Sequence, residues 1–130
     1  MDNNQQLVSN KIMTPDGTIL QSFHRHDYIT HLDKNGKVYM VDGGLDYLRR
    51  TVHKDAPYIE LSSYVNDPFD IVRRVFHWGT RGKDGKQPLK WKALADLDTD
   101  HIEAILETQT HIKQWLRDLF EQELQTRGVK

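Results

Sequence analysis

The sequence predicts an α+β protein in which an antiparallel sheet of β-hairpins carries two α-helices on one face. Three observations support this class. Short apolar runs alternate with turn sequences over residues 10–65, the apolar spacing of residues 67–78 is helical, and a longer helical stripe covers residues 98–125. Because 130 residues suffice for one core, we expect a single domain over residues 1–130.

The strongest local signal is a β-hairpin. Apolar runs at residues 28–32 and 38–41 flank a turn with an Asn-Gly pair, which is the leading short-range sign of a hairpin. A two-residue turn would pair Leu32 with Tyr39, whereas a three-residue loop with a glycine bulge would pair it with Val38. Both registers remain open from the sequence.

An earlier hairpin is predicted around Pro15-Asp16-Gly17, between strands at Lys11–Thr14 and Thr18–Phe23. The polar residues 1–9 before it are expected to be disordered. After the central hairpin, Asp42-Gly43-Gly44 predicts a sharp redirection or a close backbone approach, because glycine tolerates both.

A third hairpin is predicted from the runs Leu45–His53 and Tyr58–Val65, which flank Lys54-Asp55-Ala56-Pro57. The first of these runs also fits two turns of helix, because its apolar residues lie on one helical stripe. We favour the strand and keep the helix as the alternative.

A helix is predicted over residues 67–78, starting at Asn66-Asp67-Pro68 and stopped by Gly79. Residues 79–88 contain three glycines and mainly basic charges, so we expect a surface loop. Leu89–Ala93 is predicted to return briefly to the sheet.

The last predicted element is a long helix over residues 98–125. Asp100 and Glu103 have capping-box spacing near its start, and apolar residues recur at helical spacing to about Gln125. Such a stripe needs a surface to cover, which favours packing on the sheet.

Composition restricts the function classes. The chain has no cysteine, so disulfides, thiolate metal sites and cysteine nucleophiles are excluded. No apolar run approaches the length needed to span a bilayer, and MDNNQQLVSN lacks the pattern of a secretion signal. We therefore expect an intracellular protein without a membrane partner.

The net charge of −1 conceals a basic middle third. Residues 48–93 carry 10 Lys or Arg and 5 Asp or Glu, whereas the segments before and after are acidic. Duplex nucleic acid usually requires a basic overall balance or a dense basic helix, and this chain has neither. A small anion or an acidic partner fits the charge pattern better.

The glycine-rich loop is the candidate ligand site. Flexible glycines can expose backbone N–H groups to a phosphate, and a tryptophan, Trp78 or Trp91, can stack on a base. Arg49 and Arg50 are adjacent on a predicted strand, so their side chains point to opposite faces and only one of them can contribute to this site. The predicted anion-binding residues are Arg49, Arg50, Trp78, Arg81, Lys83 and Lys86.

His24 and His26 form a secondary candidate. On a strand they would face the same way and could present two imidazoles to one ligand, but no third metal ligand has suitable spacing. We therefore predict no metal, no cofactor and no catalytic residue. The catalytic alternative, an enzyme that cleaves or modifies a nucleotide, would use His24, His26 or His101 as acid/base groups.

Three segments together resemble a family of small proteins encoded by tailed bacteriophages. They read RHDYITHLDKNGKVYMVDGGLDYLRR, NDPFDIVRRVFHWGTRGKDGKQPL and LADLDTDHIEAIL, within about residues 12–112. The resemblance implies an accessory protein made in the host bacterial cytoplasm, and it assigns no catalytic or binding residue. Small phage proteins of this size often counter host defences, either by sequestering nucleotide signals or by binding a defence protein.

The function expected from these observations is sequestration of a small phosphate-containing ligand, such as a nucleotide immune signal, without catalysis. A homo-oligomer would help to enclose that ligand. The alternative is a protein–protein inhibitor of a host defence or host-takeover target, with the exposed hairpins or the acidic last helix as its contact surface.

Overall fold

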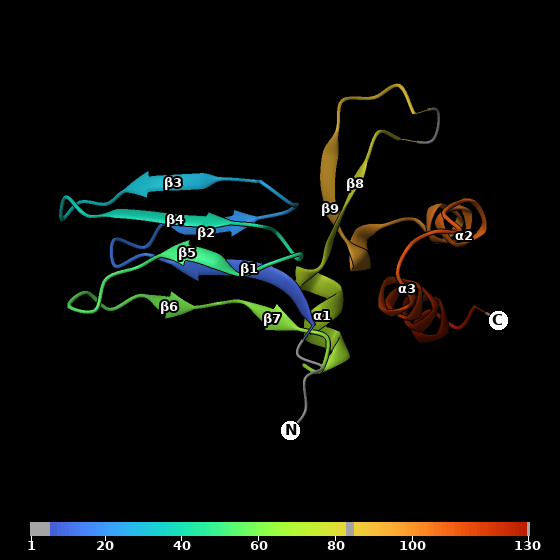
Figure 1. Cartoon of the computed structure of the whole chain (residues 1–130). Helices are drawn as coiled ribbons and strands as arrows, with labels where there is room; N and C mark the ends of the chain where they lie inside the picture. Colours follow the sequence, from blue (N-terminus) through green and yellow to red (C-terminus); the bar gives the residue numbers. More distant parts are fainter. Residues whose placement is uncertain (1–5, 83–84, 130) are drawn as a thin grey trace. The chain divides into compact units, whose positions relative to one another are not determined.

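The computed structural model describes residues 6–82 and 85–129, and it confirms the α+β class (Figure 1). The strands are antiparallel and form three sheets instead of the one expected. Within the described residues, the elements are β1 (Leu7–Met13), β2 (Ile19–Ser22), β3 (Ile29–Leu32), β4 (Val38–Asp42), β5 (Arg49–Thr51), β6 (Ile59–Glu60), β7 (Ser63–Tyr64), α1 (Phe69–Val75), β8 (His77–Thr80), β9 (Lys90–Ala93), the 3-10 helix η1 (Leu94–Asp96), α2 (Thr99–Thr108) and α3 (Gln114–Thr126).

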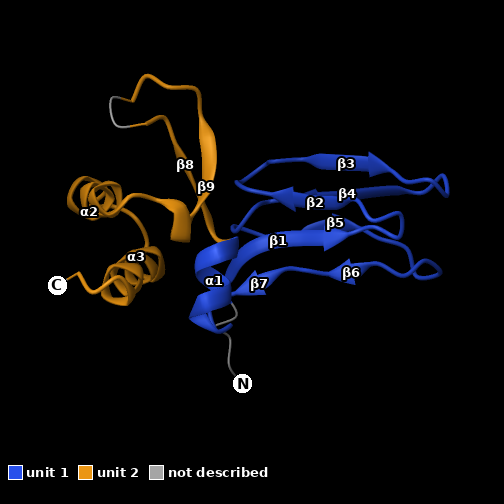
Figure 2. Cartoon of the chain, turned by 180° about the vertical axis from the view of Figure 1, so that it is seen from behind, with its two compact units in different colours: residues 1–75 blue, residues 76–130 orange. Residues whose placement is uncertain are grey.

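The chain divides into two compact units, residues 1–75 and residues 76–130 (Figure 2). We call them unit 1 and unit 2. Unit 1 contains the sheet β2-β1-β6, with β7 also paired to β1, and the sheet β3-β4-β5. Unit 2 contains the two-stranded sheet β8-β9 with helices α2 and α3. The first predicted helix, α1, belongs to unit 1 and contacts β1 and β7, whereas α2 and α3, which replace the second predicted helix, belong to unit 2.

The first hairpin confirms the predicted turn. β1 and β2 pair with Met13 opposite Ile19, and Gly17 in the turn has a φ of 89°. However, β1 begins at Leu7, and Leu7 and Val8 are buried. The expectation of disorder over residues 1–9 is therefore wrong from Leu7 onward, because two apolar side chains in a polar stretch suffice to anchor the strand. Residues 1–5 lie outside the described residues.

The central hairpin adopts the second of the two open registers, with Leu32 opposite Val38. The Asp33 N–H donates to the Lys37 carbonyl at 2.9 Å, and Gly36 has a φ of 79°. Asp33 also accepts hydrogen bonds at Oδ1 from the N–H groups of Asn35 and Lys37. This side chain stabilises the wider loop, which a two-residue turn could not hold in the same way.

The predicted third hairpin is wrong. β5 pairs with β4, and β6 pairs with β1, so the two runs belong to different sheets. The reason lies in the turn after β4, where Gly43 and Gly44 have φ values of 96° and 56°. A Cβ on Gly44 would lie 2.4 Å from the backbone N of His24, which confirms the predicted close approach. The helical alternative for residues 45–53 is also wrong, because they form a turn followed by β5.

The core of unit 1 lies where its two sheets pack together, since β4 contacts both β1 and β2. The buried members of this core are Ile12, Leu20, Tyr39 and Val41, with Ile29, Val52 and Tyr58 packed against them. Strand β4 does not alternate between buried and exposed residues, because Met40 and Asp42 are buried as well as Tyr39 and Val41.

Helix α1 is shorter than predicted and ends at Val75. Residues His77–Thr80, predicted as helix end and loop, form β8 and pair with β9. The strand predicted at Leu89–Ala93 is present as β9. Helical spacing misled the prediction here, because Phe76 and Trp78 also satisfy the two-residue period of a strand and aromatic residues favour strands.

The predicted long helix over 98–125 is two helices, α2 and α3, separated by residues 109–113. Arg117 on α3 donates to the carbonyl of Leu106 at 3.1 Å and to that of Gln109 at 3.2 Å. These carbonyls end α2, so one side chain from the following helix satisfies them. The two helices contact each other within unit 2 and bury Ile102, Ile105, Leu119 and Phe120.

Candidate functional site

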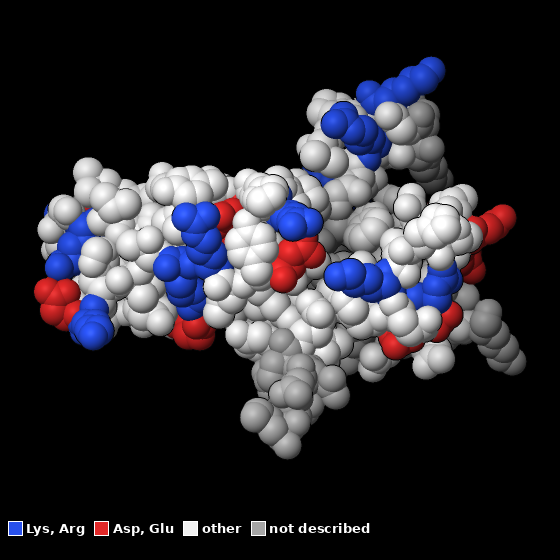
Figure 3. Space-filling view, viewed as in Figure 1, with Lys and Arg blue, Asp and Glu red and all other residues white. Residues whose placement is uncertain are grey.

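Basic side chains gather on the β8–β9 hairpin of unit 2 (Figure 3). The strand register places Trp78 opposite Lys92 and Thr80 opposite Lys90. Because directly opposed residues lie on the same face and successive residues alternate, all four side chains share one face of the hairpin. An aromatic ring, a hydroxyl and two ammonium groups are thus placed together.

The other face of the hairpin is closed by Trp91, which lies opposite Gly79. A Cβ on Gly79 would stand 3.0 Å from Cη2 and 3.1 Å from Cζ3 of the Trp91 ring. Because glycine has no Cβ, it leaves room for the Trp91 ring to lie across β8 at this position. Of the two tryptophans predicted to stack on a ligand, Trp78 lies on the face with Lys90 and Lys92, and Trp91 on the opposite face.

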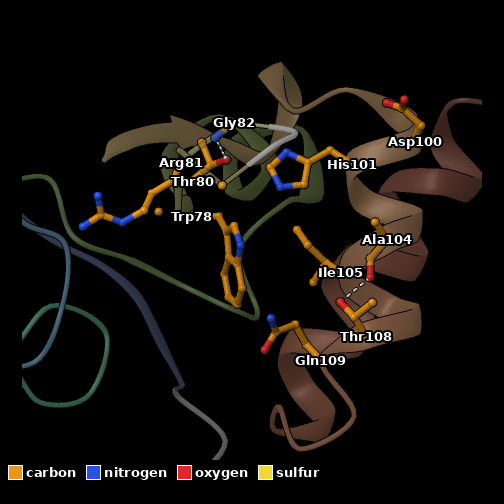
Figure 4. Close-up of a pocket in the computed structure, with 12 residues that line it drawn as sticks. Trp78, Thr80, Arg81, Gly82, Asp100, His101, Ala104, Ile105, Thr108 and Gln109 are labelled. Atoms are coloured by element: carbon orange, nitrogen blue, oxygen red, sulfur yellow. Dashed lines mark hydrogen bonds between the residues drawn. The ribbon is translucent and has the colours of Figure 1, made fainter. Parts of the chain in front are cut away.

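Helix α2 forms the second wall of a hollow of about 380 Å³ (Figure 4). Its contributing residues are spaced by one, three and four positions, so they lie on one side of the helix. They are Asp100, His101, Ala104, Ile105 and Thr108, followed by Gln109, the C-cap residue of α2. The hairpin side contributes Trp78, Gly79, Thr80, Arg81, Gly82 and Gly85.

The Trp78 ring in the wall of this hollow packs against buried aromatic side chains. The Trp78 ring packs edge-on against Phe120, with centroids 5.1 Å apart and planes at 89°. Phe120 in turn contacts Phe76 at 6.0 Å, and both phenylalanines are fully buried. Edge-to-face packing of this kind fixes the orientation of a ring. Trp78 is therefore a preformed surface for a planar ligand.

A second hollow of about 220 Å³ adjoins the first, and the two share Thr80, Gly82 and His101. Its remaining lining residues are Gln87, Pro88, Lys90, Lys92 and Asp98. The first hollow is walled by Trp78, Ile105 and Ala104, whereas the second is polar and carries two lysines. An amphipathic ligand could occupy both.

The backbone N–H groups of Gly82 and Gly85 are hydrogen-bonded within the loop. The N–H of Gly82 donates to Thr80 Oγ1 at 3.1 Å, and the N–H of Gly85 donates to the Gly82 carbonyl at 3.2 Å. Both donors thus have partners within the loop. Their positive φ values, 82° and 70°, explain why glycine occupies these positions.

The predicted basic residues of the loop divide three ways. Arg81 borders the first hollow, but its guanidinium extends away from α2 and His101 (Figure 4). Lys86 lines neither hollow. Lys83 lies outside the described residues. The lysines that do face a hollow, Lys90 and Lys92, are missed by the sequence prediction, although their alternation around Trp91 is the pattern of one strand face.

Arg49 and Arg50 lie on β5 in unit 1, on opposite faces as adjacent strand residues must. Arg49 Nη1 donates to Asp42 Oδ2 at 3.1 Å. Arg50 pairs with Glu60 and donates through Nη2 to Asn10 Oδ1 at 3.0 Å. Burial alone would raise the pKa of Glu60, but the hydrogen bonds from Arg50 and Ser62 lower it. Both arginines are thus engaged in structural contacts.

His24 and His26 lie in a turn and not on a strand, so the predicted same-face arrangement is wrong. His26 has a φ of 64°, and its Nδ1 is hydrogen-bonded to the Tyr47 hydroxyl at 3.0 Å. His24 Nδ1 donates to the Arg25 carbonyl at 2.9 Å. Over residues 6–82 and 85–129, no three His, Asp or Glu side chains come together as a metal-binding group.

Comparison of the chain with models of protein families, with curated proteins and with solved structures finds no match. In the part of the chain that the structure describes, no helix has the length and apolar character needed to cross a bilayer. The site must therefore be interpreted from its own residues.

Proposed function

We propose that this protein binds a small phosphate-containing ligand of the nucleotide class in unit 2 and holds it without chemical change. The observation that supports this function is the pair of adjoining hollows, one walled by Trp78 and the other by Lys90 and Lys92. A fixed aromatic ring suits a base, and ammonium groups suit a phosphate. The biological role we propose is the one implied by the phage resemblance, counter-defence by sequestration of a nucleotide signal in the bacterial cytoplasm.

The test is native mass spectrometry of protein purified from bacteria with and without an active nucleotide-based defence system. We expect a bound species whose mass, after release by denaturation, is that of an unmodified nucleotide. The same spectra give the oligomeric state, which we propose is above one. Protein that carries no ligand in both preparations would contradict sequestration, and release of an altered nucleotide would favour the catalytic alternative.

A matched pair of variants ties the ligand to the hollow. Ala104 is exposed and lines the first hollow, so Ala104→Trp should fill it and remove the bound species. Glu103 is equally exposed on α2 but lines neither hollow. Glu103→Trp should therefore retain the ligand. Equal retention by both variants would place the ligand elsewhere.

A second candidate function is inhibition of a host protein by surface contact. It is favoured by exposed apolar side chains on the β3–β4 hairpin, where Tyr28, Leu32 and Val38 are 58%, 65% and 50% exposed. Neighbouring exposed apolar residues of this kind mark interaction surfaces. This function predicts a co-purifying host protein that Leu32→Lys displaces, with no small molecule in the mass spectrum.

A further inference from the structure

We propose that the ligand is a nucleotide with at least two phosphates, whose base lies in the first hollow against Trp78 and whose phosphates lie in the second hollow on Lys90 and Lys92. This inference rests on the proposed ligand-binding function and narrows its ligand class. It also moves the anion-binding groups from the glycine-rich loop to strand β9.

The strand register supports this assignment. Lys90 and Lys92 are two residues apart on β9 and opposite Thr80 and Trp78, so the ring and both ammonium groups share one face. Strand residues two positions apart are separated by about 7 Å, which suits a chain of two phosphates better than a single one. Thr80 and His101 border both hollows and mark the passage between them.

The charges of the second hollow also favour phosphates. Both lysines are exposed, and none of the ion pairs found among residues 6–82 and 85–129 involves either of them. Asp98 lines the same hollow and is the N-cap residue of α2, although its side chain makes no cap hydrogen bond. The two lysines outnumber this carboxylate, and His101 adds a ring N–H donor.

The first hollow suits a base rather than a second anion. Its walls include Trp78 and Ile105, which offer apolar surface, and the side chain of Gln109 lies at its edge below the tryptophan (Figure 4). A carboxamide can both donate to and accept from the polar edge of a base. The one arginine that borders this hollow, Arg81, directs its guanidinium away from it.

The experiment is isothermal titration calorimetry of the full chain with ADP, GDP, CDP and UDP. For each diphosphate that binds, the titration is repeated with its nucleoside and with pyrophosphate. The key variant is Lys90→Ala/Lys92→Ala. Its matched control is Lys86→Ala/Lys113→Ala, which removes the same charge from unit 2 at two positions that line neither hollow. All four positions are exposed, and the melting temperature of each variant verifies its fold.

We expect the nucleoside to bind at least about tenfold more weakly than its diphosphate, and the lysine variant to lose at least about tenfold in affinity. The control variant should retain affinity within about threefold, because only the long-range electrostatic potential at the second hollow changes. Loss in the control variant alone, or equal loss in both variants, would overturn the placement while leaving ligand binding intact. No heat with any of the four diphosphates would overturn this ligand class, and the proposed function would then depend on the mass spectra alone.

Discussion

Gly79 lines the first hollow, and its position on β8 is closely packed against the Trp91 ring. Its backbone needs no special φ, and the constraint is the Trp91 ring, which would lie 3.0 Å from a Cβ at this position, with Leu89 Cδ1 at 3.3 Å. We expect Gly79→Ala to force the ring aside and to lower the free energy of unfolding by about 1–2 kcal/mol, the usual cost of overpacking. Urea denaturation measures it. If the contact is the cause, Gly79→Ala should cost little in a Trp91→Leu background, and an unchanged cost there would contradict it.

Asp16 gives the second prediction at this scale. Its carboxylate accepts a hydrogen bond from Thr14 and contacts His31 Nε2 at 2.9 Å, so the turn of the first hairpin is joined to β3. These hydrogen bonds, that of Thr14 first and that of His31 second, hold the pKa of Asp16 well below its ordinary value of 3.8. The folded state therefore binds this proton less readily than the unfolded chain does.

It follows that the contribution of Asp16 to stability is present above its unfolded pKa and is lost as the pH falls toward its folded pKa. We expect Asp16→Asn to lower the free energy of unfolding most above about pH 5, and the difference from the unmodified protein to shrink as the pH falls below about 4. Urea denaturation of both proteins across this range measures the difference. A deficit that is independent of pH would mean that the carboxylate charge is not the stabilising feature.

The residues that the sequence could identify are those whose contacts are local. The turn at Gly17 and the close approach at Gly44 follow from the backbone freedom of glycine, and both are present. The engagement of Arg50 could not be foreseen, because Asn10 is 40 residues away along the chain. An arginine with no local partner in the sequence can therefore be structural in the fold.

At the scale of elements, periodicity predicted most segments and failed where two periods coincide. Residues 76–79 satisfy both a helix and a strand, and pairing with β9 decides between them. The break between α2 and α3 has no glycine or proline to mark it, since residues 109–113 read QTHIK. Arg117 stabilises that break from the next helix. Of the first hollow, the sequence prediction included Trp78 and Arg81 but did not place α2 as the opposite wall.

The end of α3 provides a test of how unit 2 is held together. Glu123 is fully buried, and Arg127 Nε donates to its Oε2 at 2.7 Å. Arg127 also reaches Thr99 Oγ1 at 3.0 Å and the Leu94 carbonyl at 3.2 Å, so it joins α3 to α2 and η1. Removing one partner of a buried ion pair is costly because the other charge stays in a low-dielectric interior.

We expect Arg127→Met to lower the free energy of unfolding by about 3 kcal/mol. The matched control is Arg74→Met, which removes an arginine from another pair at the same four-residue spacing, with Asp70, whose two side chains are both mostly exposed. That change should cost less than about 1 kcal/mol, because exposed ion pairs contribute little. Equal costs by guanidinium denaturation would show that burial of Glu123 does not determine the strength of the contact.

At the scale of the whole molecule, the basic middle third of the sequence is divided between the two units. Arg49 and Arg50 belong to unit 1 and contact Asp42 and Glu60, whereas Lys90 and Lys92 belong to unit 2 and border a hollow. A count of charges along the chain cannot separate these roles, because pairing depends on the fold. The α+β class was predictable from the sequence. Which basic residues form ion pairs and which border a hollow was not.

Net charge also distinguishes the proposed nucleotide site from a surface that binds duplex nucleic acid. The net charge is −1, and a duplex is bound mainly through many simultaneous phosphate contacts. We expect a fluorescent duplex of about 20 base pairs to give no anisotropy change with about 10 μM protein at about 0.15 M salt. A nucleoside diphosphate, which we propose contacts Trp78 and the two lysines of the second hollow, should still bind under those conditions. Duplex binding that survives at this salt concentration and is lost in Lys90→Ala/Lys92→Ala would instead make the β8–β9 hairpin a nucleic-acid surface, with the tryptophan and lysines serving a polymer and not a small ligand.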